Sequence, residues 1–134
     1  MFEHFIAAQE PVYRTALREL EAGRKQSHWM WFIFPQIAGL GFSAMSQRFA
    51  LHSLGEAQSY LGHPVLGERL RDCTRAVLKH PDRSAYAILG SPDDMKFHSS
   101  MTLFSRAAPE EALFREALDT FFRGEADPNT LTRL

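Results

Sequence analysis

The densest hydrophobic stretch of the chain runs from Ser27 to Gln36 and reads SHWMWFIFPQ. Six large apolar residues follow one another here, and both tryptophans are among them. A run of this density predicts a segment that is buried on nearly all sides. Its periodicity fits one face of a strand or one face of a short helix, but Ser27 as N-cap and Pro35 as terminator favour the helix.

The rest of the chain has the pattern of short helices. Apolar residues recur at spacings of three and four, and prolines, glycines and serines delimit the segments. The predicted helices span residues 2–8, 11–22, 43–51, 53–61, 64–80, 84–89, 91–106, 109–123 and 127–131. The segment that begins at Pro64 is expected to be the longest.

Two helix starts carry clear signals. Ser53-Leu54-Gly55-Glu56 is a capping box, in which serine and glutamate each satisfy a free backbone N–H. Ser91-Pro92-Asp93-Asp94 offers a capping serine, a proline at the first helical position and two acids at the positive end of the helix dipole. No convincing pair of strands is present. We therefore predict a compact, irregular all-α single domain over residues 1–134, with about seven to nine short helices.

Composition narrows the class of protein. At 134 residues and 45% hydrophobic, the chain can bury one core without disulfides. Fifteen basic and sixteen acidic residues nearly cancel, so neither nucleic acid nor a membrane is expected as a partner. The single Cys73 excludes an internal disulfide, and its helical setting predicts a core residue rather than a nucleophile. No signal peptide or membrane span is recognisable, which predicts a cytosolic protein.

Candidate chemistry lies on the helix predicted after Pro92. Asp94 and His98 share one face of it, so the carboxylate could orient the imidazole as an acid or base. The plainer interpretation is a surface ion pair. The same spacing suits a pair of metal ligands, but the other histidines are scattered without paired spacing. Neither a metal site nor a cofactor is predicted.

The same helix carries a cation and three hydroxyl groups. Lys96, Ser99, Ser100 and Thr102 follow one another over two turns and could line a pocket for a phosphate or a ribose. The two acids at the start of the helix already occupy the positive end of its dipole. A ribose hydroxyl or a cation suits that end better than a phosphate.

A second polar cluster frames the aromatic run. Lys25 and His28 precede it, and Gln36 follows it. Trp29 and Trp31 differ by about 200° on a helix, so they face different neighbours. One can pack in the core while the other stacks on the ring of a ligand. In the alternative, both are core residues.

Several of these motifs together resemble a known family. They are the string from Lys25 to Gln36, the turn Gly39-Leu-Gly41 with Ser43, the string His63-Pro-Val-Leu-Gly67, and the segment from Gly90 with Asp94, Lys96 and Ser99-Ser-Met-Thr-Leu-Phe104. This set is similar to domain-of-unknown-function family 1810 (DUF1810) of bacteria and fungi, over essentially the whole chain. The resemblance implies a mainly α-helical domain with a helical aromatic run. It implies no established activity, and nothing in this sequence supports the calpastatin label of some members.

Two function hypotheses follow. In the first, the chain binds or hydrolyses a ribose-containing nucleotide derivative, similar to ADP-ribose or NAD, between the aromatic helix and the helix of residues 91–102. The candidate ligand-binding residues are Lys25, Trp29, Trp31, Gln36, Lys96, Ser99, Ser100 and Thr102. Cleavage of a glycosidic bond would use Asp94 to stabilise an oxocarbenium-like centre and His98 or His28 to move the proton.

In the second hypothesis, the chain is a protein-interaction module without catalytic activity, as a monomer or a homodimer. A concave pocket that contains His28, Trp31, Asp94 and Lys96 favours the nucleotide hypothesis. A flat apolar patch without these groups favours the interaction module.

Overall fold

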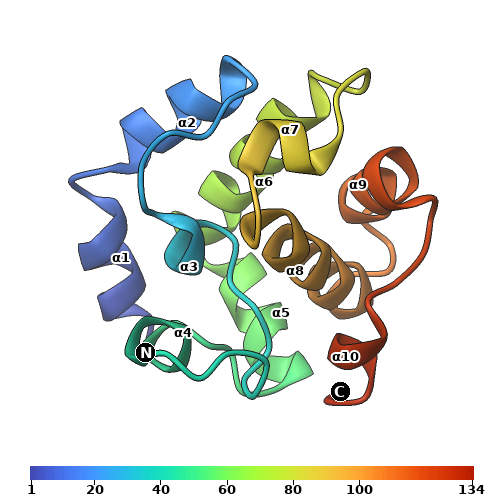
Figure 1. Ribbon diagram of the computed structural model, residues 1–134. Coiled ribbons are helices and arrows are strands. Elements are labelled where there is room, and N and C mark those ends of the chain that lie inside the picture. Colours follow the sequence, from blue (N-terminus) through green and yellow to red (C-terminus); the bar gives the residue numbers. More distant parts are fainter.

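The computed structural model describes all residues from Met1 to Leu134 and contains ten helices and no strand (Figure 1). The helices are α1 (Glu3–Gln9), α2 (Tyr13–Glu21), α3 (Met30–Ile33), α4 (Ala44–Arg48), α5 (Leu54–Gly62), α6 (Leu66–Leu78), α7 (Ala85–Leu89), α8 (Asp93–Ala107), α9 (Ala112–Phe122) and α10 (Pro128–Leu131). One isolated parallel bridge pairs Ile37 with Leu51. The all-α prediction is confirmed. The number of helices slightly exceeds the expected seven to nine, because even the shortest predicted segments form helices of their own.

Side chains begin several of the helices as the sequence predicts. The Ser43 and Ser53 hydroxyls accept hydrogen bonds from backbone N–H groups in the first turns of α4 and α5. The Asp127 carboxylate does the same for α10. These bonds satisfy donors that a helix start otherwise leaves free.

Two predicted caps and one predicted length are wrong. Ser27 and Ser91 do not cap α3 and α8, because the N-cap positions fall on the residues Trp29 and Pro92. The longest helix is α8 rather than α6. Helix α6 begins late because the His63 imidazole Nδ1 accepts from the backbone N–H groups of Val65 and Leu66, so the chain turns there before the helix starts.

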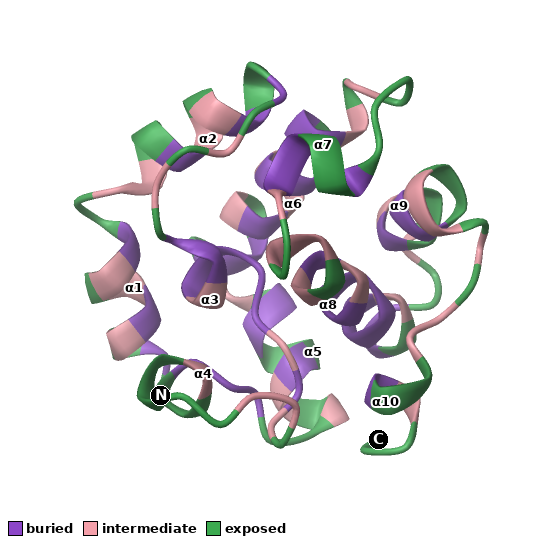
Figure 2. Ribbon diagram, viewed as in Figure 1, coloured by how far each residue is buried: buried purple, intermediate pink, exposed green.

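Helix α8 lies at the centre of the molecule, in contact with α5, α7, α9 and α10 (Figure 1). Its predicted apolar stripe of Phe97, Met101 and Phe104 is completely buried, and burial continues around most of its middle turns (Figure 2). Near its N-terminus, the first turn of α8 keeps several side chains near solvent. The central helix therefore anchors the core with its middle and presents polar groups at its N-terminal end.

Cys73 of α6 is part of the core, as predicted. Burial, and then the negative charge of Asp72, raise the pKa of its thiol to about 12, so the thiol stays protonated near neutral pH. We expect a thiol reagent such as DTNB to react with the native protein at least about a hundredfold more slowly than with the protein in denaturant. Equal rates in the two states would contradict this burial.

Candidate functional site

The aromatic segment packs against the N-terminal half of α8. The Phe34 ring, directly after α3, meets the Phe97 ring of α8 edge-on with centroids 4.9 Å apart. Trp29 is completely buried, and Trp31 is half-buried. One indole is therefore a core residue and the other is partly accessible, which is one of the two predicted alternatives. The predicted stacking of a ligand on Trp29 is not available, because its ring has no exposed face.

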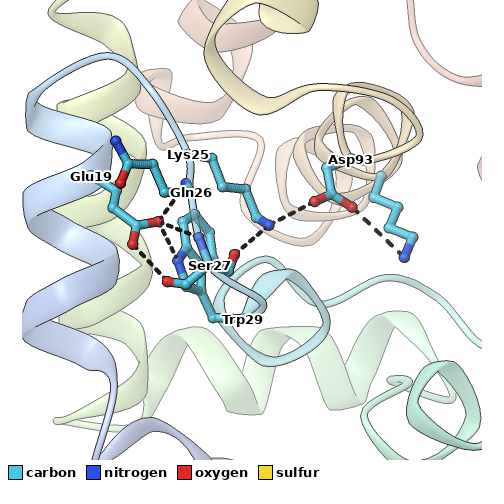
Figure 3. A network of polar contacts seen from close by, with 7 residues as sticks. Glu19, Lys25, Gln26, Ser27, Trp29 and Asp93 are labelled. Carbon is cyan, nitrogen blue, oxygen red and sulfur yellow. Dashed lines mark hydrogen bonds and ion pairs between the residues drawn. The ribbon is translucent and has the colours of Figure 1, made fainter.

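Glu19 of α2 holds the segment that precedes the aromatic run (Figure 3). Its Oε1 accepts hydrogen bonds from the backbone N–H groups of Gln26 and Ser27, at 2.8 and 3.0 Å, and from the Trp29 indole Nε1, at 3.0 Å. The Ser27 hydroxyl donates to Oε2 at 2.6 Å. Partial burial acts to raise the pKa of this carboxyl, but the four hydrogen bonds outweigh it and lower the pKa to about 2.

Lys25 is fixed in place by several partners. Its ammonium lies 2.9 Å from Asp93 Oδ2 and donates to the Ser27 carbonyl at 2.6 Å. It also lies 4.8 Å from the centre of the Trp29 ring, and its side chain is only 8% exposed. The backbone N–H of Lys25 donates to the carbonyl of Ile88 in α7. Lys25 therefore joins α7, the start of α8 and the aromatic run.

Lys96 is held much more loosely. Its ammonium is 3.8 Å from the other carboxylate oxygen of Asp93, and it makes no hydrogen bond. It lies 5.0 Å from the centre of the Trp31 ring, a cation–π distance. The side chain is 22% exposed. Lys96 therefore brings a positive charge to the surface with most of its hydrogen-bonding capacity free.

Two cavities meet at Lys96. The first, here called the Trp31 cavity, has a volume of about 300 Å³ and is lined by Lys25, His28, Trp29, Met30, Trp31, Ser91, Pro92, Asp93 and Lys96. The second, the Asn129 cavity, has a volume of about 260 Å³ and is lined by Gln36, Leu40, Gly41, Ser46, Pro92, Met95, Lys96, His98, Ser99, Asp127 and Asn129. Because Pro92 and Lys96 belong to both walls, the cavities are neighbours. Together they form the candidate site.

Most of the predicted site residues line these cavities. The Trp31 cavity brings together Lys25, His28, Trp31 and Lys96, and His28 is exposed there. The Asn129 cavity includes Gln36, His98 and Ser99. The Ser99 hydroxyl lies 3.1 Å from the Met95 carbonyl oxygen and 3.0 Å from Asp127 Oδ2. The predicted proximity of the aromatic helix and the helix after Pro92 is thus present in the structure.

Three predicted residues lie outside both cavities. Ser100 and Thr102 are completely buried in the core face of α8. The Thr102 hydroxyl donates to the His98 carbonyl at 2.8 Å and accepts from the Asp127 N–H at 2.9 Å, so it joins α8 to α10 instead of lining a pocket. Asp94 also lines neither cavity. Neighbouring helical residues point about 100° apart, and Asp93 is the acid on the cavity side.

The predicted pairing of Asp94 with His98 does not form. No hydrogen bond or ion pair joins them, and the His98 Nε2 contacts the Glu125 carbonyl oxygen at 2.7 Å. The imidazole stacks on the Phe122 ring with centroids 4.1 Å apart. Packing against α9 and the residues after it therefore orients His98, and the carboxylate one turn earlier does not.

The structure adds three residues that the sequence did not connect with the site, and it selects Asp93 from the two acids that the sequence placed at the start of this helix. Asp93 carries the central carboxylate of the Trp31 cavity, and Ser46, Asp127 and Asn129 line the Asn129 cavity. The two acids after Pro92 signalled a helix start, but not which acid would face Lys25. The only local signal at Asp127 was its place as the residue before α10. Ser46 and Asn129 carry no sequence signal, because only tertiary packing brings α4 and α10 beside α8.

No three His, Cys, Asp or Glu side chains cluster in a way that could hold a metal ion. None of the ten helices combines the length and the apolar character that crossing a bilayer requires.

Comparisons with known proteins identify the family. The family profile described as "Protein of unknown function (DUF1810)" matches residues 1–134. A crystal structure of the conserved hypothetical protein Rv1873 from Mycobacterium tuberculosis is similar to the chain with a TM-score of 0.97 and 47% sequence identity. The similarity covers 99% of this chain and 95% of that protein. No protein of curated function matches. The chain therefore belongs to the DUF1810 family.

Proposed function

We propose that this member of the DUF1810 family binds a ribose-containing nucleotide derivative, of the ADP-ribose or NAD type, across the Trp31 and Asn129 cavities. The observation that carries the proposal is the position of Lys96, a loosely held cation above an accessible indole at the boundary of the two cavities. A nucleotide presents an anion, an aromatic ring and a polyol to its binding site. The candidate site offers one partner for each.

The phosphate is the part of such a ligand that Lys96 would bind. In the Trp31 cavity, Lys25 and Lys96 face the single carboxylate of Asp93. Lys25 already neutralises that carboxylate at 2.9 Å, so the charge of Lys96 is left for a ligand. A charge-assisted hydrogen bond to phosphate is about twice as strong as a neutral one. The exposed His28 is a further donor at the same cavity.

The ring and the sugar would occupy the two sides of Lys96. Trp31 is half-buried and lines the cavity, so a base could stack on the accessible part of its ring. On the other side, Gln36, Asn129 and the Asp127 carboxylate line the Asn129 cavity. Amide and carboxylate groups of this kind suit the hydroxyls of a ribose.

Binding is tested first with a panel of ADP-ribose, NAD, nucleotides and nucleosides, by thermal shift and by tryptophan fluorescence. A ligand at one hundred times its dissociation constant stabilises a protein by about 2.7 kcal/mol, which raises the melting temperature by several degrees. If a ligand quenches the fluorescence of the wild type but not that of Trp31→Phe, the change comes from Trp31. The absence of any response across the panel contradicts the proposal. Concentration-dependent dimerisation in the same samples would then favour an interaction module, to which the exposed Phe42 and Met95 point.

Lys96→Met is expected to weaken binding of phosphate-bearing ligands by about tenfold or more, because it removes the free cation and keeps the length of the side chain. Nucleosides without phosphate should lose less than about threefold. Lys79→Met is the matched control, since Lys79 also forms an ion pair at 3.8 Å, with Glu21, but lines no cavity. Isothermal titration of both variants measures the difference. Equal losses for nucleotides and nucleosides would rule out a phosphate contact at Lys96.

Hydrolysis of the bound ligand is the further step of this proposal. Asp93 rather than Asp94 is the carboxylate that a bound sugar could approach, because only Asp93 lines the Trp31 cavity. The histidine at the same cavity is His28. Chromatographic detection of nicotinamide released from NAD, with wild type and Asp93→Asn, separates a binding protein from a glycosidase.

A further inference from the structure

A third cavity lies between α2 and the segment that leads from α2 to α3. Its volume is about 420 Å³, and it is lined by Thr15, Arg18, Glu19, Ala22, Arg24 and Gln26. It shares no lining residue with the Trp31 cavity or the Asn129 cavity. We call it the Arg24 cavity. It is therefore a separate cavity from the two that form the candidate site.

The side chains of this cavity hold an excess of free hydrogen-bond donors. Neither Arg18 nor Arg24 takes part in an ion pair or donates a side-chain hydrogen bond. By contrast, Arg71 on α6 is engaged by both oxygens of Glu111, at 2.8 and 3.1 Å. Two arginines without ion-pair partners, beside the single carboxylate of Glu19, leave this hollow with a net positive charge.

Glu19, the one acid of the cavity, forms no ion pair with these arginines. Both carboxylate oxygens of Glu19 accept hydrogen bonds from the segment Gln26–Trp29, and none from a guanidinium. The Thr15 hydroxyl and the Gln26 side-chain amide make no hydrogen bond and can also donate. The Arg24 cavity therefore presents two cations and two neutral donors, and its carboxylate is already occupied.

From this arrangement we propose that the Arg24 cavity binds a small molecule that carries a phosphate or diphosphate group. A guanidinium matches phosphate oxygens with two parallel N–H donors, and two guanidiniums can engage a dianion from two sides. The phosphate replaces the missing counter-ion of Arg18 and Arg24. The volume of the cavity leaves room for a small organic group beside the phosphate.

The cavity is connected to the candidate site through a shared wall. Arg24 and Gln26 line the Arg24 cavity, while Lys25, His28 and Trp29 of the same segment line the Trp31 cavity. Glu19 binds this segment through backbone and side-chain donors (Figure 3). An anion beside Arg24 therefore changes the surroundings of the Glu19–Trp29 hydrogen bond, and the indole N–H of Trp29 reports on its binding.

The test is an NMR titration with inorganic pyrophosphate, in which the Trp29 indole signal is identified by its persistence in Trp31→Phe. Saturable shifts of this signal and of the Gln26 amide are expected. Arg18→Ala and Arg24→Ala should each weaken binding by about tenfold or more, because each removes a charged pair of donors. Arg14→Ala is the matched control, an exposed arginine of α2 outside the cavity, and its effect should stay within about twofold.

Three outcomes overturn the proposal. They are the absence of saturable shifts at millimolar pyrophosphate, an equal loss of affinity in Arg14→Ala, and a loss of the response in Lys96→Met. The second outcome would indicate a diffuse attraction to the basic face of α2. The third would assign the binding to the candidate site instead. Because the substituted arginines are exposed, melting curves of the variants should match that of the wild type, which separates lost binding from lost folding.

Discussion

The substitution Gly67→Ala is expected to lower the free energy of unfolding by about 3 kcal/mol or more. Gly67 is buried in the first turn of α6, where that helix crosses the end of α5. A Cβ atom at this position would lie 2.1 Å from the carbonyl oxygen of Leu61 and 2.9 Å from its carbonyl carbon. These are backbone atoms that no rotamer change can move, so α5 and α6 would have to separate. The better helix propensity of alanine, about 1 kcal/mol, offsets only part of this cost.

Gly62→Ala is the matched control for this substitution. Gly62 is the last residue of α5 and follows Leu61 directly, but a Cβ there would meet no atom within 4 Å. Its effect should stay within about 0.5 kcal/mol. Denaturant unfolding of the two variants and the wild type measures both values. Similar stabilities for the two alanine variants would show that α5 and α6 do not approach as closely as the structure has them.

The features that the sequence predicted well are those set by neighbours within about four residues. The serine half of the predicted capping box is an example, since the Ser53 hydroxyl accepts from the Glu56 N–H, whereas Glu56 Oε1 accepts from the His52 N–H at 3.4 Å and not from that of Ser53. The burial of Phe97, Met101 and Phe104 follows in the same way from their spacing along one helix. The cap depends on the free N–H groups of a first helical turn, and the burial depends on helical periodicity. Both can be inferred from the order of residues along the chain.

The features that the sequence could not give depend on contacts between distant segments. Position 67 requires glycine because α6 approaches the backbone of α5 closely there. The residues around Gly67 in the sequence do not reveal this approach. Glu19 occupies an ordinary polar position of α2, yet its partners lie seven to ten residues further on. The choice between Asp93 and Asp94 depends on how α8 is rotated against Lys25. Packing such as the Phe34–Phe97 contact sets this rotation.

The candidate site shows the same division. The sequence supplied most of the residue types, because cations, an indole and amides stand out beside an aromatic run. It could not exclude Ser100 and Thr102, which have the same chemistry as Ser99 but are completely buried. On a central helix such as α8, hydroxyl groups occur on core-facing and cavity-facing sides alike. The Thr102 hydroxyl donates to the His98 carbonyl and so enters the core at little cost, whereas the Ser100 hydroxyl is buried there without a hydrogen-bond partner.

The second large effect is expected for Glu19→Ala, which should destabilise the fold by about 3 kcal/mol. The substitution leaves the Trp29 indole N–H without an acceptor although Trp29 is completely buried. It also frees the backbone N–H groups of Gln26 and Ser27. Because the same segment carries Lys25 and His28, ligand binding at the Trp31 cavity should weaken together with stability. Denaturant unfolding and the ligand titration measure the two effects.

Glu19→Gln separates the charge of this carboxylate from its shape. The amide oxygen can still accept from the Trp29 indole, so the loss near neutral pH should be smaller, roughly 1–2 kcal/mol after solvent screening of this half-buried group. In the wild type, the folded state holds the pKa of Glu19 at about 2, below its ordinary value of 4.5. Its contribution to stability is therefore complete above pH 4.5 and disappears as the pH falls towards 2. Glutamine does not titrate, so the stability difference between wild type and Glu19→Gln should shrink over this interval. A difference that stays constant from pH 6 to pH 2 would mean that the carboxylate is not the group that holds the segment.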